Sequence, residues 1–237
     1  MKTRFLAIAA LAVGLTYSAA RAYQGEAVAD GGKITGIVKF QGTAPKPKPI
    51  EITKDKEVCG LTPKVDESLL VGADGGLKDA VVMITSISKG KPFGDKKPVL
   101  EQKGCQYIPH VLLTPPAATI DITNDDGILH NIHTYSKKNP PVNRAQPKFK
   151  KVIQEKFDQA EIFEVRCDAH GWMEGWVAVQ ENPYYAVTDA SGKYELTDVP
   201  PGNYEVKVWH SDLPEKTEKV TVPAKGEAKA DFTLASK

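Results

Sequence analysis

The strongest constraint on the fold of this chain is the form of its apolar segments. They are short, rich in Val, Ile, Tyr and Phe, and separated by Gly, Pro, Asp and Asn. Such segments between turn-forming residues are typical of β-strands, and none has the apolar period of a long helix. The sequence therefore predicts an all-β fold of the sandwich type, with room at most for one short helical turn at residues 154–159. Strands are expected at residues 33–40, 80–86, 119–123, 130–135, 161–167, 175–180, 193–196, 204–210 and 219–222.

The charge of the chain narrows the choice of partners. Its 237 residues include 31 Lys and Arg and 30 Asp and Glu, which gives a formal net charge of +1. Proteins that bind nucleic acid carry a strong positive field, so a nucleic-acid partner is not expected. Two polar loops, residues 88–98 and 136–151, are both rich in basic residues and are expected to be solvated. Their functional alternative is a basic docking surface for an acidic redox partner.

The N-terminus has the pattern of a secretory signal peptide. Lys2 and Arg4 precede an apolar run over residues 5–15, and the small residue Ala22 closes the segment. The run is shorter than the roughly 20 residues that a membrane helix needs. We therefore predict that residues 1–22 are a signal peptide, that the mature protein is periplasmic or otherwise secreted, and that it has no membrane span.

Export to an oxidising compartment makes the cysteine count informative. There are three cysteines, Cys59, Cys105 and Cys167, so at least one has no intramolecular partner. A disulfide between Cys59 and Cys105 is our hypothesis. It would leave Cys167 free, among other potential metal ligands.

Residues 167–173 carry the chemistry of the sequence. They read Cys-Asp-Ala-His-Gly-Trp-Met, so a thiolate, an imidazole and a thioether follow one another at intervals of three. Soft sulfur ligands combined with imidazole select copper over hard cations, and two His, one Cys and a weak axial Met form the blue-copper ligand set. The best candidate for the second imidazole is His130. The alternatives are that Cys167 is a buried inert thiol or a disulfide partner, and that the site holds a structural zinc ion.

This pattern resembles the cupredoxins, over roughly residues 70–180. The first histidine stands in a His-Asn-hydrophobic strand, and the Cys-x-x-His-x-x-Met spacing is similar to that of amicyanin, the short-loop type. The resemblance implies a Greek-key β-sandwich that holds one type 1 copper ion. By the same resemblance Asn131 is the group whose hydrogen bonds hold the ligand loop, and Trp172 covers that loop. The implied copper ligands are His130, Cys167, His170 and Met173.

The function implied by the resemblance is a one-electron carrier, not an enzyme. Its partner would be a redox protein such as a c-type cytochrome or a dehydrogenase. The alternative is an exported copper-handling protein without an electron-transfer role. A second metal site that involves His110, His133 or His210 is a further possibility. A small redox enzyme, the third functional alternative, would need such a second site. His133 follows His130 by an odd offset on the expected strand and is therefore predicted to point to the opposite face.

The last part of the chain resembles the carboxypeptidase-regulatory-like, transthyretin-like β-sandwich. The resemblance depends on a Gly-x-Tyr-x-Leu motif that begins at Gly192 and a Val-Pro-Pro-Gly-x-Tyr motif that begins at Val199. Such modules usually have structural or interaction roles, so no catalysis is expected from it. The predicted organisation is a signal peptide at 1–22, a cupredoxin-like copper domain at 23–180 and a small β-sandwich domain at 181–237.

Overall fold

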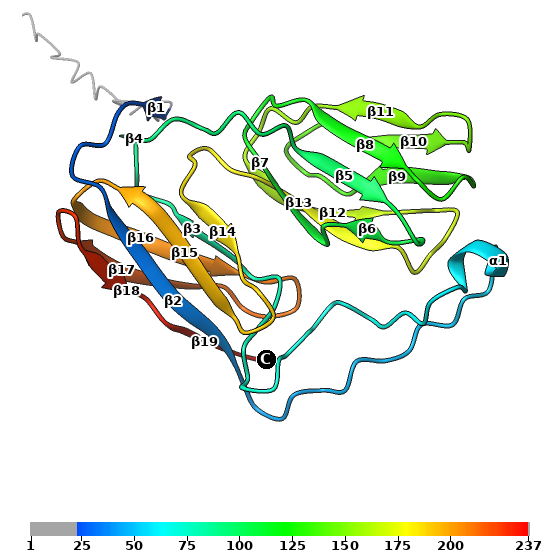
Figure 1. The fold of residues 1–237 in the computed structure, drawn as a ribbon, viewed down its shortest axis with the longest axis horizontal. Helices are drawn as coiled ribbons and strands as arrows, with labels where there is room; N and C mark the ends of the chain where they lie inside the picture. The colour runs from blue at the N-terminus through cyan, green and yellow to red at the C-terminus, as the bar shows by residue number, and fades with distance from the viewer. Residues whose placement is uncertain (1–22, 237) are drawn as a thin grey trace, which may run out of the picture.

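The computed structural model of this protein describes residues 23–236, so the predicted signal peptide lies outside the described residues. The described chain is almost entirely β-structure and forms two sandwiches that lie side by side (Figure 1). The predicted all-β class is therefore confirmed. Within residues 23–236 no helix has the length and apolar character needed to cross a membrane.

The first sandwich is built from a five-stranded sheet of order β10-β9-β12-β13-β7 and a four-stranded sheet of order β11-β8-β5-β6. Apolar side chains of both sheets meet in one core, which also contains all three cysteines and Met173. The strands are β5 (Val99–Gln102), β6 (Tyr107–Ile108), β7 (Val111–Thr114), β8 (Ile120–Asn124), β9 (His130–Thr134), β10 (Asn143–Gln146), β11 (Val152–Glu155), β12 (Glu161–Arg166) and β13 (Glu174–Val179).

Alternation of side chains determines which face of each strand joins this core. In β12, Phe163 and Val165 are buried, whereas Glu164 and Arg166 point outward and pair with each other. Successive side chains of a strand lie on opposite faces of the sheet, so this order of residues fixes the register of β12 against the core. The same strand leads directly into the buried Cys167.

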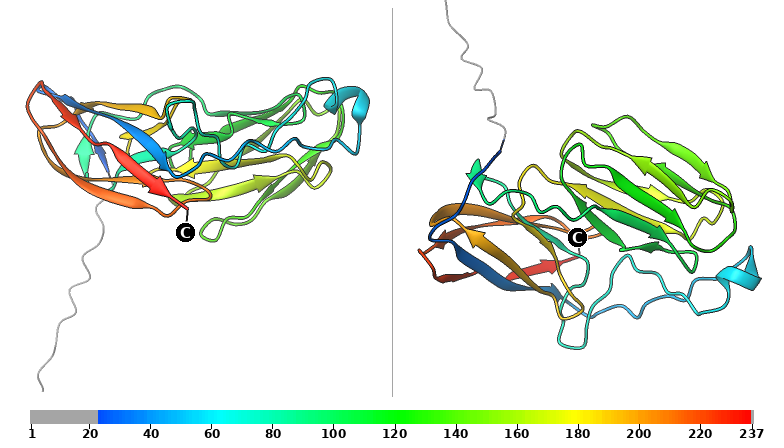
Figure 2. Two further views of the ribbon diagram at one scale, coloured as in Figure 1. Left: turned by 90° about the horizontal axis from the view of Figure 1, so that it is seen from below. Right: turned by 45° about the horizontal axis from the view of Figure 1, so that its top comes forward.

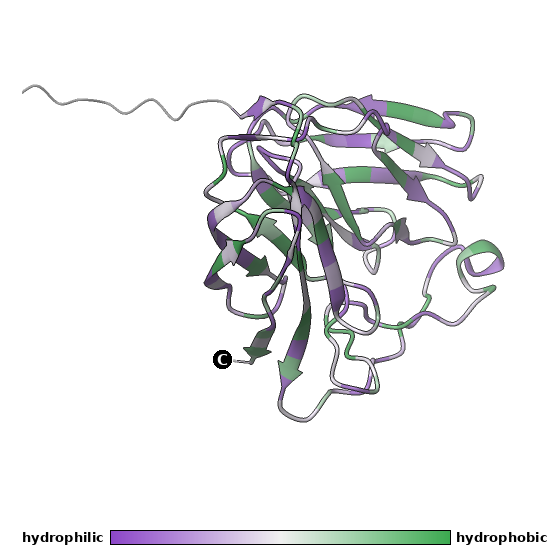
Figure 3. Ribbon diagram, turned by 60° about the vertical axis from the view of Figure 1, so that its left-hand side comes forward, coloured by the Kyte–Doolittle hydropathy of each residue, from purple (hydrophilic) through white to green (hydrophobic). Residues whose placement is uncertain are grey.

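The second sandwich consists of a sheet of order β14-β3-β16-β17 and a sheet of order β15-β2-β18, in which β2 also pairs with β19. Figure 3 shows apolar and polar residues in turn along these strands, as expected for sheets with one buried face. The strands are β2 (Gly32–Gln41), β3 (Val81–Ile84), β14 (Tyr185–Val187), β15 (Lys193–Val199), β16 (Gly202–Trp209), β17 (Lys216–Val222), β18 (Glu227–Lys229) and β19 (Phe232–Ala235), and two short strands, β1 (Gln24–Gly25) and β4 (Lys89–Gly90), pair beside it.

The second sandwich takes an interior strand of each sheet from the N-terminal part of the chain. Strand β2 lies between β15 and β18, and β3 lies between β14 and β16. The predicted division at residue 180 therefore does not separate the two sandwiches. Gly36 in β2 shows how closely this part of the sandwich packs, because a Cβ atom there would lie 1.9 Å from the carbonyl oxygen of Ala230.

A long crossing segment, residues 42–79, connects β2 to β3 and is called the strap below. It leaves the second sandwich, runs to the far end of the first sandwich, forms the short helix α1 (Lys56–Cys59) and returns (Figures 1 and 2). The Cys59–Cys105 disulfide fixes the strap to the first sandwich and confirms the predicted pairing. Cys167 remains free among the three cysteines of the described chain.

Three local predictions differ from the structure. Residues 154–159 contain the end of β11 and irregular chain rather than a helical turn, and the helix that does form, α1, was not expected. Strand β10 lies within the segment predicted as a polar loop, residues 136–151. Both β10 and β11 are edge strands, and edge strands carry the polar side chains that resemble a loop in sequence.

A small apolar cluster joins the two sandwiches. Val111 and Ala178 of the first sandwich pack there with Val81 and Met83 of the second. The rings of Trp176 (β13) and Trp209 (β16) meet edge to face with centroids 5.0 Å apart. This contact and the strap hold the sandwiches together at two separate places.

Candidate metal centre

The predicted ligands come together at one end of the first sandwich. His130 begins β9, Cys167 directly follows β12, and His170 and Met173 stand in the tight loop before β13. Backbone hydrogen bonds close this loop: the N–H of His170 donates to the carbonyl of Cys167 at 3.3 Å, and that of Met173 to the carbonyl of His170 at 2.9 Å. The N–H of Cys167 donates back to the carbonyl of Met173 at 3.2 Å, so both ends of the loop are joined.

Three donor atoms form a buried triangle. The Sγ of Cys167 lies 3.9 Å from the Nδ1 of His130 and 3.8 Å from the Nδ1 of His170, and the two Nδ1 atoms are 3.0 Å apart. All three side chains are almost completely buried. Ligand atoms that each lie about 2 Å from one ion are roughly 3–4 Å from each other, so the triangle has the size of a metal site. Met173 is also buried within this loop.

Each histidine of the triangle contacts a carboxylate through the ring nitrogen that faces away from the triangle. The Nε2 of His130 lies 2.8 Å from Asp126, and the Nε2 of His170 lies 2.7 Å from Asp55. An acceptor on one ring nitrogen fixes the tautomer and leaves the other nitrogen free to bind a metal. The carboxylates therefore turn both Nδ1 atoms toward Cys167.

Asp126 is itself fixed by the backbone beside the disulfide. It accepts hydrogen bonds from the N–H groups of Gly104 at 2.5 Å and Cys105 at 2.7 Å. Burial acts to raise the pKa of Asp126, but the hydrogen bonds from His130 and from this backbone outweigh it and lower the pKa. Asp126 is thus an ionised, oriented partner for His130.

Two of the three donors of the triangle are shifted toward the forms that bind metal, and the third, His130, carries a proton that a metal ion would displace. Burial acts to raise the pKa of Cys167, but hydrogen bonds from His130 and from the backbone of Asn131 and His170 outweigh it. The pKa of Cys167 is therefore lowered, which favours the thiolate form. Burial lowers the pKa of His170, which keeps this imidazole neutral. For His130, burial opposes the charge, yet Asp126 and Cys167 raise the pKa to about 9. A metal ion would take the place of that proton.

Asn131 connects β9 to the ligand loop. Its side-chain oxygen accepts hydrogen bonds from the backbone N–H of Asp168 at 2.6 Å and of Ala169 at 3.3 Å, and its amide nitrogen donates to Asn143 at 3.0 Å. The hydroxyl of Tyr107 donates to the Asn131 carbonyl at 2.6 Å. These contacts are of the kind expected for a residue that holds the loop in place.

Trp172 and the strap cover the triangle on its outer side. The Trp172 ring lies 5.2 Å from that of His170, and its Nε1 donates to the carbonyl of Cys105 at 3.3 Å. From the strap, the Lys54 ammonium donates to the carbonyl of Ala169 at 3.3 Å. The ring of His170, a ligand candidate, is fully shielded by these neighbours.

The other histidines lie apart from the triangle. His133 faces the opposite side of β9, as the odd offset predicts, where its Nδ1 lies 3.0 Å from Asp168 and its ring stacks on Tyr135. His210 is buried in the second sandwich, where its Nδ1 accepts a hydrogen bond from the backbone of Asp212 at 3.2 Å. His110, directly before β7, has a buried side chain and lies outside the triangle as well.

Sequence reasoning missed the two carboxylates. Asp126 stands four residues before His130, and this spacing could have indicated it, whereas Asp55 is 115 residues from His170 and no local signal points to it. A second group of potential donors, Cys105, Asp126 and His130, also lies close together. Since the Cys105 sulfur is bonded to Cys59, that group has no thiolate to offer.

Comparisons with known proteins gave matches to a family model and to solved structures. The family model of the carboxypeptidase regulatory-like domain matches residues 177–235. A methionine-to-alanine mutant of amicyanin with Cu(I) is 20% identical over 42% of this chain and 98% of its own, with a TM-score of 0.33. A purple cupredoxin from Nitrosopumilus maritimus is 26% identical over 31% of this chain and 81% of its own, with a TM-score of 0.28. Comparison with curated proteins gave no match.

Proposed function

We propose that this protein is an exported copper protein that carries single electrons between redox partners. His130, Cys167 and His170 would hold the ion, with Met173 as a weak fourth ligand. The observation that carries the proposal is the buried triangle of one thiol sulfur and two Nδ1 atoms, 3.0–3.9 Å apart. A soft thiolate with two imidazoles is a donor set that copper prefers.

The protein's part in this function is to keep the donors in place. A copper ion held here would alternate between Cu(I) and Cu(II) and so accept and release one electron. The carboxylates behind the two histidines, the Asn131 hydrogen bonds and the disulfide allow the donors little movement. A site that changes shape little between the two oxidation states needs little reorganisation, and this property suits an electron carrier better than a copper-delivery protein.

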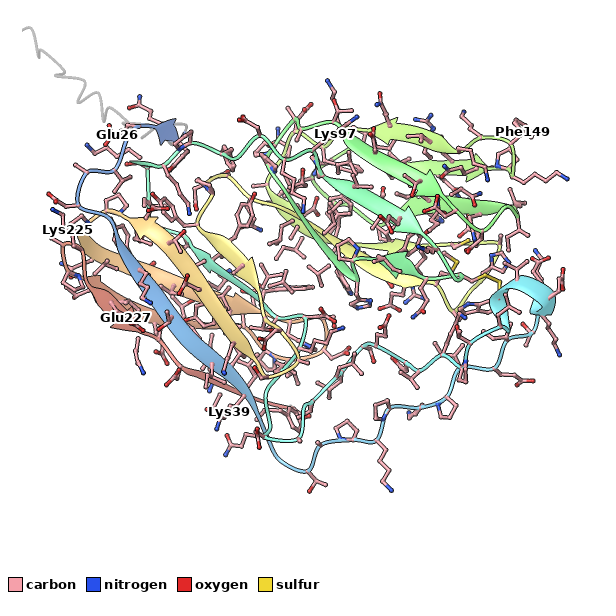
Figure 4. All side chains as sticks on the ribbon, viewed as in Figure 1. Glu26, Lys39, Lys97, Phe149, Lys225 and Glu227 are labelled. Atoms are coloured by element: carbon pink, nitrogen blue, oxygen red, sulfur yellow. A yellow bond between two sulfur atoms is a disulfide. The ribbon has the colours of Figure 1, made fainter. Side chains whose placement is uncertain are left out.

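A basic, partly apolar tip lies at the same end as the triangle. Strand β10 pairs Gln146 with His130, so the turn that follows β10 is close to the metal end. Phe149 in this turn has an exposed fraction of 81%, and Lys148, Lys150 and Lys151 surround it. Figure 4 places Phe149 at the far end of the first sandwich, away from Glu227 in the second. An acidic redox protein, such as a c-type cytochrome or a dehydrogenase, is the partner that such a tip fits.

The test is visible absorption and electron paramagnetic resonance of the purified protein after addition of Cu(II). We expect an intense thiolate-to-copper band with a narrow copper hyperfine splitting, and loss of both in the Cys167→Ser variant. Cys59→Ser with Cys105→Ser removes two sulfur atoms but leaves the proposed ligand, so at saturating Cu(II) it should keep the band even though loss of the disulfide is expected to weaken copper binding. A colourless protein, or an intense band that survives Cys167→Ser, would contradict the proposal. A weak signal of ordinary Cu(II) would favour copper handling.

A further inference from the structure

A second polar site lies beside the ligand loop but uses other residues. It is a cavity of about 340 Å³ between the strap and the first sandwich. Asp66 and Glu67 line it from the strap, and His110 and Glu174 line it from the ends of β7 and β13. Three carboxylates thus face this cavity, and the cationic side chain of Lys48 also lines it.

His110 offers this cavity a buried ring nitrogen that has no hydrogen-bond partner among the described residues. Its side chain has an exposed fraction of 7%, and its Nδ1 is buried without a hydrogen-bond partner among residues 23–236. An unpaired buried nitrogen is costly, so such groups in a native fold usually have a water, an ion or a functional role to explain them. The same Nδ1 lies 3.9 Å from the Oε2 of Glu67, too far for a hydrogen bond.

This separation suits an ion between the two atoms. Ligand nitrogen and oxygen atoms lie about 2.0–2.2 Å from Zn²⁺, so a nitrogen and an oxygen 3.9 Å apart can both reach one ion with a wide angle between them. Gln106 already holds the Glu67 carboxylate in position through a hydrogen bond of 3.1 Å. Hydrogen bonds from Ser68 lower the pKa of Asp66, so a second negative charge is present in the cavity. Imidazole with carboxylate is a donor set for a borderline divalent cation rather than for Ca²⁺ or Mg²⁺.

We propose that His110 and Glu67 bind a divalent cation of the zinc class in this cavity, with water completing the coordination. The two proposed donors are separate from the thiolate triangle, because His130, Cys167 and His170 do not line this cavity. It does share Trp172 and Met173 as neighbours, so an ion bound there would lie next to the ligand loop.

Equilibrium dialysis against Zn²⁺, with metal counted by mass spectrometry, tests this site in two backgrounds. One is the full protein already loaded with one equivalent of copper, and the other is the Cys167→Ser variant, in which the triangle has lost its thiolate. In both backgrounds we expect the cavity to bind one zinc ion per chain. In either background, His110→Gln and Glu67→Gln should weaken zinc binding at least tenfold, whereas Glu57→Gln, an exposed glutamate on the same strap, should not.

The chemical shift of the His110 imidazole nitrogens gives a second readout. Zinc should move the Nδ1 resonance of His110 and leave that of His133 in place. The proposal is overturned if no zinc is bound beyond the first site, or if His110→Gln and Glu67→Gln bind zinc as the unaltered protein does. Loss of copper binding with the zinc result intact would contradict the proposed function alone.

Discussion

Asp126 and Asp55 fix which ring nitrogen His130 and His170, the proposed ligands, turn toward Cys167. Neither carboxylate contacts the other two donors, so its effect on a bound metal passes through the histidine that it holds. Partners of this kind typically change metal affinity by about 10–100-fold when they are removed. The orientation of the two imidazoles therefore depends on these carboxylates.

Asp126→Asn is the sharpest test of this dependence. We expect copper affinity to fall about 10–100-fold, because the amide has no charge to support the His130 imidazole. A competition titration of Cu(I) with a chelator measures the change. Asp125→Asn is the matched control, since Asp125 is the exposed neighbour of the same residue type. Equal affinities for Asp126→Asn and the unaltered protein would show that the carboxylate does not orient the ring.

His210 predicts how the stability of the protein depends on pH. Burial lowers its pKa to about 4, against a smaller raising effect of Asp79, while the positive charge of His110, when protonated, adds to the lowering. The unfolded chain binds a proton at His210 below about pH 6.5, but the folded protein does so only near pH 4. The contribution of His210 to the free energy of unfolding is thus fully present above pH 6.5 and is lost as the pH falls toward 4. The loss is on the order of 3 kcal/mol.

Denaturant unfolding at pH 7 and at pH 5 measures this loss. In the His210→Gln variant the decrease in the free energy of unfolding between the two pH values should be smaller than in the unaltered protein. An identical pH dependence in the variant and the unaltered protein would exclude His210 as its source.

At the scale of elements, the strap is the feature that no sequence pattern revealed. It brings Asp55 to His170 and Cys59 to Cys105, pairs that are 115 and 46 positions apart in the chain, and it contains no long strand or helix. The ligand loop, in contrast, was predictable because three donors stand within seven residues and the flanking strands alternate. Local spacing records contacts within an element, whereas contacts made by a long crossing segment depend on the tertiary fold.

Removal of the disulfide tests the strap as a unit. Its cysteines are 46 residues apart, and a cross-link of that span stabilises the fold by about 4 kcal/mol in the chain-entropy model. Cys59→Ala with Cys105→Ala should therefore lower the free energy of unfolding by that order, measured with denaturant. Copper affinity should fall as well, since the released strap no longer holds Asp55 against His170. If the double variant is destabilised but binds copper as before, the strap does not depend on the disulfide to reach His170.

At the scale of the whole molecule, the chain folds with its N-terminal part shared between two sandwiches. Sequence motifs located the second sandwich, because its turns have specific residues, and the family model agrees over residues 177–235. They did not reveal that β2 and β3 complete its sheets. The sequence of a strand does not identify the strand with which it pairs. An alternation pattern therefore predicts that a strand forms but not which sheet it joins.

This arrangement predicts that residues 181–237 do not fold by themselves. The fragment lacks the interior strands β2 and β3, whose side chains Ile34, Val38, Val82 and Ile84 are buried in the core of that sandwich. Without them β15 and β18 have no common neighbour, and β14 and β16 are likewise separated. Circular dichroism and the dispersion of amide resonances should show an unfolded fragment, with residues 23–237 as the folded control. Cooperative unfolding of the isolated fragment would mean that the β-strands of this sandwich pair in a different order when β2 and β3 are absent.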